Sequence, residues 1–102
     1  MEKVILKRHS VLLERFEHES KKVAGYLLAY ADTKGTVSEK AMKLHVQNQL
    51  GSLYATLTEW ENLMAFCEAH DLPFKCEEAV QECRRYTNRL KRSFKKLPQP
   101  TY

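Results

Sequence analysis

The residues best suited to chemistry in this chain are Cys67, His70 and Cys76, which bracket a short segment that contains Asp71. Cys67 and His70 are three residues apart, so they would share one face of a helix. Thiolate and imidazole groups are common zinc ligands, and a tetrahedral site would need Asp71 or Glu77 as its fourth ligand. However, the spacing is not that of a known zinc finger. Because every cysteine also falls on an apolar stripe, we expect small buried thiols here and no bound metal.

Motifs for catalysis are absent from the sequence. It has no glycine-rich phosphate loop, no HExxH pattern and no serine, histidine and aspartate in a recognisable context. Glu14, Glu17 and Glu19 lie close together, but paired-carboxylate catalysis requires one carboxyl group to be desolvated and its neighbour not. No such difference is indicated, so we predict that the chain is not an enzyme and needs no cofactor.

The strongest functional signal is a run of positive charge at the C-terminal end. Residues 84–102 contain seven basic side chains and no acidic one, whereas residues 1–83 carry a net charge of −3. Four of the basic residues, beginning at Arg85 and ending at Lys96, are spaced 4-3-4, so they would follow one helix face for about 16 Å. The helix dipole favours cations in a last turn. Seven cations without an acid repel one another, which indicates an anionic partner. The candidate partner-binding residues are Arg84, Arg85, Arg89, Lys91, Arg92, Lys95 and Lys96, with Tyr86 and Tyr102 as aromatic neighbours.

Two classes of partner fit this basic segment. Nucleic acid would use the cations for phosphate contacts and the tyrosines for stacking. The chain as a whole carries a charge of only +4, and it has no helix-turn-helix or zinc-finger signature. An acidic protein surface is therefore the preferred partner, because segregated charge gives orientation as well as attraction. Direct nucleic-acid binding through the same face is the alternative.

The rest of the charge is also segregated. No lysine or arginine occurs between Lys43 and Lys75, and this stretch contains Glu59, Glu61 and Glu68. We expect a rod that is cationic at one end and anionic at the other.

Apolar spacing places these residues on helices. Two stripes with 4-3 spacing extend over about three heptads, which is the pattern of two helices packed along their length. The stripes are Val46, Leu50, Leu53, Leu57, Trp60, Met64 and Cys67, then Cys76, Val80, Cys83, Thr87, Leu90, Phe94 and Leu97. If the two helices form a hairpin, Cys67 lies opposite Cys76, and Trp60 lies opposite Cys83.

A third stripe lies near the N-terminus, and the three together predict the fold. It comprises Ile5, Leu12, Phe16, Val23, Leu27 and Tyr30, with His9 and Ser20 in its gaps. The fold class is all-α, an elongated antiparallel three-helix bundle with a long αα-hairpin and helices at about 3–31, 37–69 and 73–97. Residues 1–97 form a single helical domain, and residues 98–102 form an extended proline-containing tail.

Local signals define the helix ends. Thr36 and Glu39 have the spacing of a capping box. Gly51 lies within the second helix, which we expect to continue through it, with a break there as the alternative. Asp71 is a candidate cap for the third helix, since Pro73 is acceptable in a first turn.

The turn before the third helix contains a second candidate contact. Leu72 and Pro73 form an X-Pro bond on which a prolyl isomerase could act, although prolines more often only end helices.

Location and assembly follow from absent signals. The chain has no apolar segment long enough for a membrane span and no signal peptide, so we expect no membrane contact and a cytoplasmic protein. The first helix alone would leave the distal ends of the long hairpin uncovered. Self-association as a homodimer through these ends is an alternative.

The chain resembles small phage-encoded helical inhibitors of host nucleases, of the anti-RecBCD type. The resemblance is carried by the basic Arg84–Lys96 helix, the helical bundle and the Leu72–Pro73 turn. It implies a protein that docks on a helicase-nuclease in the host cytoplasm and inhibits it, and it transfers no individual functional residue.

Overall fold

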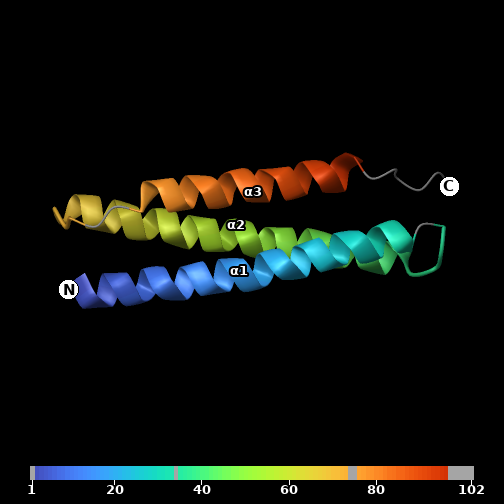
Figure 1. Cartoon of the computed structure of the whole chain (residues 1–102), viewed down its shortest axis with the longest axis horizontal. Helices are drawn as coiled ribbons and strands as arrows, with labels where there is room; N and C mark the ends of the chain where they lie inside the picture. Colours follow the sequence, from blue (N-terminus) through green and yellow to red (C-terminus); the bar gives the residue numbers. More distant parts are fainter. Residues whose placement is uncertain (1, 34, 74–75, 97–102) are drawn as a thin grey trace.

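The protein is a rod of three helices. The computed structural model describes residues 2–33, 35–73 and 76–96, which form α1 (Glu2–Asp32), α2 (Glu39–Ala69) and α3 (Glu77–Lys96). In Figure 1, α1 and α3 run in the same direction, and α2 runs back between them. The molecule measures 55 × 18 × 15 Å. The predicted all-α, elongated antiparallel three-helix bundle is therefore confirmed.

Every buried apolar side chain among the described residues belongs to one of the three predicted stripes, and the last member of the third stripe, Leu97, lies outside the described residues. Trp60, Tyr30 and Leu53 are fully buried, and each comes from the interior side of its helix. Thr87, the one polar member of the α3 stripe, is also fully buried. Its hydroxyl donates a hydrogen bond of 2.8 Å to the carbonyl of Cys83 one turn earlier, so no polar group is left unsatisfied there.

Polar residues complete the α1 stripe where it lacks apolar ones. The indole Nε1 of Trp60 donates a hydrogen bond to Nδ1 of His9 at 2.9 Å, and the two rings lie 5.3 Å apart. The buried hydroxyl of Ser20 donates to the carbonyl of Glu17 at 2.9 Å. Both gaps in the stripe are thus part of the packed interface.

Contacts between α2 and α3 agree with the predicted alignment of the hairpin. The Tyr54 hydroxyl donates to the side-chain carbonyl of Asn88 at 2.8 Å. Near the turn, Cys67 and Cys76 line the same cleft. The two helices therefore pack in the register that their stripes specify.

The turn between α2 and α3 is built differently from the prediction. Asp71 adopts a left-handed backbone conformation with φ 52°. Its amide donates to the carbonyl of Glu68 at 3.3 Å, and the Leu72 amide donates to that of Cys67 at 2.9 Å. This pair of bonds is the Schellman arrangement that closes a helix C-terminus. Asp71 therefore ends α2, and its predicted role as the cap of the third helix is wrong.

The third helix consequently starts later than residue 73. Its first intrahelical bond runs from the Val80 amide to the Cys76 carbonyl at 3.0 Å, and α3 begins at Glu77. Pro73 lies before the helix in non-helical backbone. The left-handed residue at the end of α2 redirects the chain, and several residues are needed before it can run back along α2.

The predicted capping box of Thr36 and Glu39 does not form at the start of α2. The N-cap residue is Ser38, and its side chain makes no capping hydrogen bond. A carboxylate oxygen of Glu39 accepts from the Gly35 amide at 3.3 Å, and the Thr36 hydroxyl accepts from the Ser38 amide at 3.3 Å. Gly35 has φ 76°, a conformation that favours glycine. The helix begins at Glu39, two residues after the predicted start, and it continues unbroken through Gly51 as predicted.

Candidate partner-binding face

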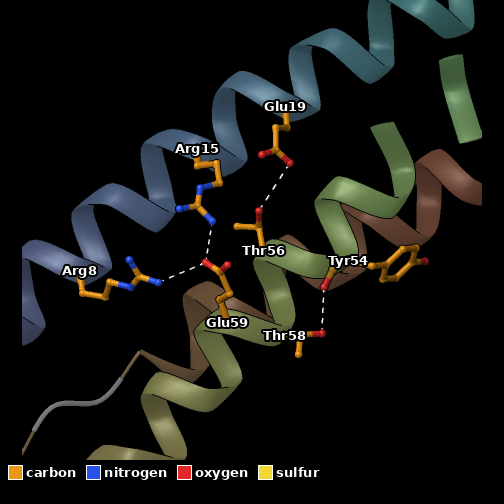
Figure 2. A network of polar contacts seen from close by, with 7 residues as sticks. All are labelled: Arg8, Arg15, Glu19, Tyr54, Thr56, Thr58 and Glu59. Carbon is orange, nitrogen blue, oxygen red and sulfur yellow. Dashed lines mark hydrogen bonds and ion pairs between the residues drawn. The ribbon is translucent and has the colours of Figure 1, made fainter. Parts of the chain in front are cut away.

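Two of the acidic side chains predicted to make one end of the rod anionic form salt bridges with arginines of the other helices. Glu59 pairs with Arg15 at 2.6 Å and with Arg8 at 3.4 Å, and both arginines come from α1 (Figure 2). Beside them, the Thr56 hydroxyl donates to Glu19 at 3.5 Å. Glu61 of α2 is also paired, with Arg84 of α3. Because these two acidic residues are neutralised, the segregation of charge along the rod is weaker than predicted.

The basic residues of α3 differ in how far they are engaged within the molecule. Arg84 forms an ion pair with Glu61 of α2. Lys91 lies over the ring of Tyr54, with its ammonium nitrogen 5.6 Å from the ring centre. These two cations therefore join α3 to α2, and the structure gives them a role within the fold.

The remaining cations are directed to solvent. They are Arg85, Arg89, Arg92, Lys95 and Lys96, and all are exposed. Among the described residues, no acidic side chain lies within ion-pair distance of these five. We refer to them as the cationic face.

The cationic face borders two hollows on different sides of α3. The groove between α1 and α3 is lined by Phe16, Glu82, Cys83, Arg85, Tyr86, Arg89 and Arg92. A second hollow, formed by α3 alone, is lined by Arg85, Asn88, Lys91, Arg92 and Lys95. Arg85 and Arg92 lie at the border of both, so a partner on either side would meet them.

Tyr86 belongs to the α1–α3 groove. Its ring is half-buried and meets Phe16 of α1 edge-on, with ring centres 6.4 Å apart. The guanidinium of Arg89 lies 5.7 Å from the centre of the Tyr86 ring. The ring is thus held between the two helices, where it forms part of the wall of the groove.

Phe16 and Glu82 were not among the predicted site residues. The sequence places Phe16 in the core stripe of its helix. The heptad position of Glu82, seven residues before Arg89, was a signal that the two share one side of α3. That Phe16 faces the same groove depends on how α1 packs, which no local pattern shows.

Leu72 and Pro73 do not join the cationic face. They line a small cavity with residues at the start of α1, namely Glu2, Ile5 and Leu6, at the end of the rod where the hairpin turns. Tyr102, the other predicted aromatic contact, and the tail at 98–102 lie outside the described residues. The structure thus brings together the basic residues and Tyr86 alone.

Cys67 and Cys76 are buried thiols, and Cys83 is half-buried. Cys67 and Cys76 are 1% and 6% exposed. Burial raises the pKa of the Cys76 thiol, with smaller contributions from Cys67 and from Glu77. Burial, followed by the charges of Glu82 and Glu17, raises the pKa of the Cys83 thiol to about 11. Thiols with a raised pKa are poor nucleophiles and poor metal ligands at neutral pH.

The zinc site considered as an alternative around the turn is not supported by the described side chains. The His70 ring packs on Phe66, with ring centres 4.4 Å apart. Within residues 2–33, 35–73 and 76–96, no three His, Cys, Asp or Glu side chains are grouped so that they could hold a metal ion.

Comparison with protein-family models, with curated proteins and with solved structures gives no match. Across the part of the chain that the structure describes, none of the helices combines the length and apolar character that crossing a membrane requires.

Proposed function

We propose that this chain is a non-enzymatic binding module. Through the cationic face of α3 it docks on an acidic surface of a larger protein complex that processes nucleic acid, and it modulates or inhibits that complex. The observation that carries the proposal is a set of five exposed lysines and arginines on one helix, with no ion-pair partner among the described residues. Cations that repel one another and have no acidic partner within the described fold are expected to be compensated by a partner.

The composition of the site favours protein over nucleic acid. Glu82 lines the same groove as Arg85 and Arg89, so a phosphate backbone laid along the groove would meet a carboxylate. Arg84 is already paired with Glu61. A protein partner can place a cation opposite Glu82, whereas a polyanion of uniform charge cannot.

Reversal of charge on the face tests the proposal. In the Arg85→Glu, Arg89→Glu, Arg92→Glu variant we expect helical circular dichroism like that of the unmodified chain, because these exposed side chains form no ion pair with any other described residue. We expect the variant to capture no partner from extracts of the native cell, measured by affinity capture and mass spectrometry.

A control variant distinguishes the position of the substituted charges from the change in net charge of the chain. Lys3→Glu, Lys7→Glu, Lys21→Glu makes the same change in net charge on the exposed side of α1. We expect this control to retain the partner. If the α3 variant binds as well as the unmodified chain, the cationic face is not the docking site.

The alternative, direct binding of nucleic acid, is tested by electrophoretic mobility shift. We expect no shift of mixed-sequence DNA by micromolar protein at physiological salt. A shift whose affinity falls by several powers of ten as salt rises would favour the alternative, because such a slope reports release of counterions from phosphates.

A further inference from the structure

The groove between α1 and α3 has opposite charge at its two ends. Glu82 lies at the end nearer the start of α3, and Arg85, Arg89 and Arg92 follow in order along the helix. Glu17 of α1 adds to the acidic end, because its charge, together with burial and Glu82, raises the pKa of the neighbouring Cys83 thiol. A ligand in this groove thus meets negative charge first and positive charge after it.

The floor of the groove is less polar than its rims. Phe16 is 5% exposed and meets the half-buried ring of Tyr86 edge-on. Cys83 lies beside them and, with a pKa of about 11, is an uncharged thiol at neutral pH. An apolar side chain that enters between the charged rims would therefore find apolar contacts.

The arginines are spaced as the residues of a second helix would be. Arg85, Arg89 and Arg92 are separated by four and three residues, which is about 10 Å along the axis. Carboxylates at positions i, i+4 and i+7 of a partner helix have the same separation. The planar guanidinium group can bind a carboxylate through two parallel hydrogen bonds, which makes arginine well suited to this pairing.

We propose that the α1–α3 groove binds an amphipathic α-helix of the partner protein, with carboxylates facing the arginines, an apolar side chain over Tyr86 and a lysine or arginine facing Glu82. This inference rests on the proposed function, since it specifies which side of the cationic face is used and by what. The basic residue is the distinctive feature of the ligand, because the acidic end of the groove would repel a helix that is acidic throughout.

Two synthetic helical peptides test the charge order. The first carries a lysine at one end, then a leucine and glutamates spaced 4-3. The second is identical except that glutamate replaces the lysine, so it is more negatively charged. In calorimetric titration of the full chain, we expect the lysine peptide to bind about tenfold more tightly than the second peptide, even though the second is more acidic. If the all-acidic peptide binds as tightly or more tightly, attraction is due to net charge and the inference is wrong.

Variants of the protein test the position. Arg89 lines the α1–α3 groove and Lys91 lines the hollow on the other side of α3. We expect Arg89→Glu to weaken binding of the lysine peptide about tenfold. Lys91→Glu makes the same change in net charge and should weaken this binding by less than about threefold. We expect Glu82→Lys to reverse the preference between the two peptides. Equal losses in the Arg89 and Lys91 variants, or an unchanged preference in the Glu82 variant, would overturn the inference.

The failure of this inference differs from that of the proposed function. If the two peptides bind equally tightly but the triple arginine variant still loses the cellular partner, the cationic face is the docking site and the groove is not. If the triple variant keeps the partner, both are wrong.

Discussion

At the scale of single residues, the contact between Trp60 and His9 is central to the packing of α1 on α2. Trp60 is the largest fully buried side chain, and its indole N–H is donated to His9 at 2.9 Å. Nδ1 can accept this bond only if it carries no proton, so the interaction requires neutral histidine. The partly buried position of His9 also lowers its pKa, because burial disfavours the charged imidazolium.

We expect stability to fall as the pH drops below about 6.5, the ordinary pKa of histidine. Above this pH, His9 is neutral in both the folded and the unfolded chain, and the full stability is present. Below it, the unfolded chain takes up a proton more readily than the folded chain, so the free energy of unfolding decreases until the pH is below the folded pKa as well. Urea titrations followed by tryptophan fluorescence at about pH 7.5 and pH 5 would measure the change.

Two histidine variants complete this experiment. His9→Gln removes the titrating group, and its stability should change less between the two pH values than that of the unmodified chain. His18 is exposed, so His18→Gln should keep the original pH dependence. Identical curves for the unmodified chain and His9→Gln would show that His9 is not the group responsible.

At the scale of the elements, Gly51 lowers the stability of α2 although the helix continues through it. Gly51 is exposed within a continuous helix, and a Cβ atom added there would lie more than 4 Å from every described atom outside the adjacent backbone of α2. Glycine lowers helix stability because its unfolded backbone is more flexible than that of alanine.

We therefore expect Gly51→Ala to raise the free energy of unfolding by roughly 0.5–1 kcal/mol. Gly35→Ala is the matched comparison and should lower it, because Gly35 has φ 76°, which strains an alanine. Thermal unfolding by circular dichroism measures both. A destabilised Gly51→Ala would mean that α2 is bent at this position.

The polar network around Glu59 joins α1 to α2 and so helps to set the position of the α1 wall of the groove (Figure 2). Its three charged side chains are each more than a third exposed, which limits its strength through screening by solvent.

We expect Glu59→Gln to reduce the free energy of unfolding by about 0.5–1 kcal/mol at low salt and by less at high salt. Glu68, an exposed glutamate on the same helix, serves as the control, because among the described residues it forms no ion pair. Urea unfolding at two salt concentrations gives the comparison. A loss for Glu68→Gln equal to that for Glu59→Gln would contradict a specific role for the network.

At the scale of the whole molecule, shape and charge together determine how the protein can associate. The radius of gyration is 16.6 Å, larger than the roughly 13 Å expected of a globular chain of this length. If two copies packed with their α3 helices facing each other across a twofold axis, their cationic faces would meet, which is electrostatically unfavourable. The α3 surface is therefore suited to an unlike partner.

We expect a mass of 12.0 kDa by light scattering, even though the elongated shape causes early elution in gel filtration. A species of twice this mass that dissociates in the Arg85→Glu, Arg89→Glu, Arg92→Glu variant would show that the cationic face binds a second copy instead. High-salt buffer is the stringent condition, because repulsion between the faces is then most screened and a dimer would form most easily.

The three helices, their apolar stripes, the register of the hairpin and the exposed arginines of α3 could all be predicted from the sequence. These follow from periodicity, which depends only on helix geometry and on the burial of apolar groups. Even the polar gap at His9 was visible, although the hydrogen bond from Trp60 that accounts for it was not. The local sequence was less informative at the turn, where Asp71 closes α2 in a left-handed conformation that a cap for the next helix would not adopt.

Packing between the helices determines which charges are neutralised and which residues lie beside the charges that are not. Arg84 and Arg85 are adjacent in sequence and equally basic, yet one pairs with Glu61 and the other faces solvent. Likewise, Phe16 and Arg89 share a groove although more than seventy residues separate them. Salt bridges and grooves depend on distances between helices, and these are set by the packing of the whole bundle, which no local pattern contains.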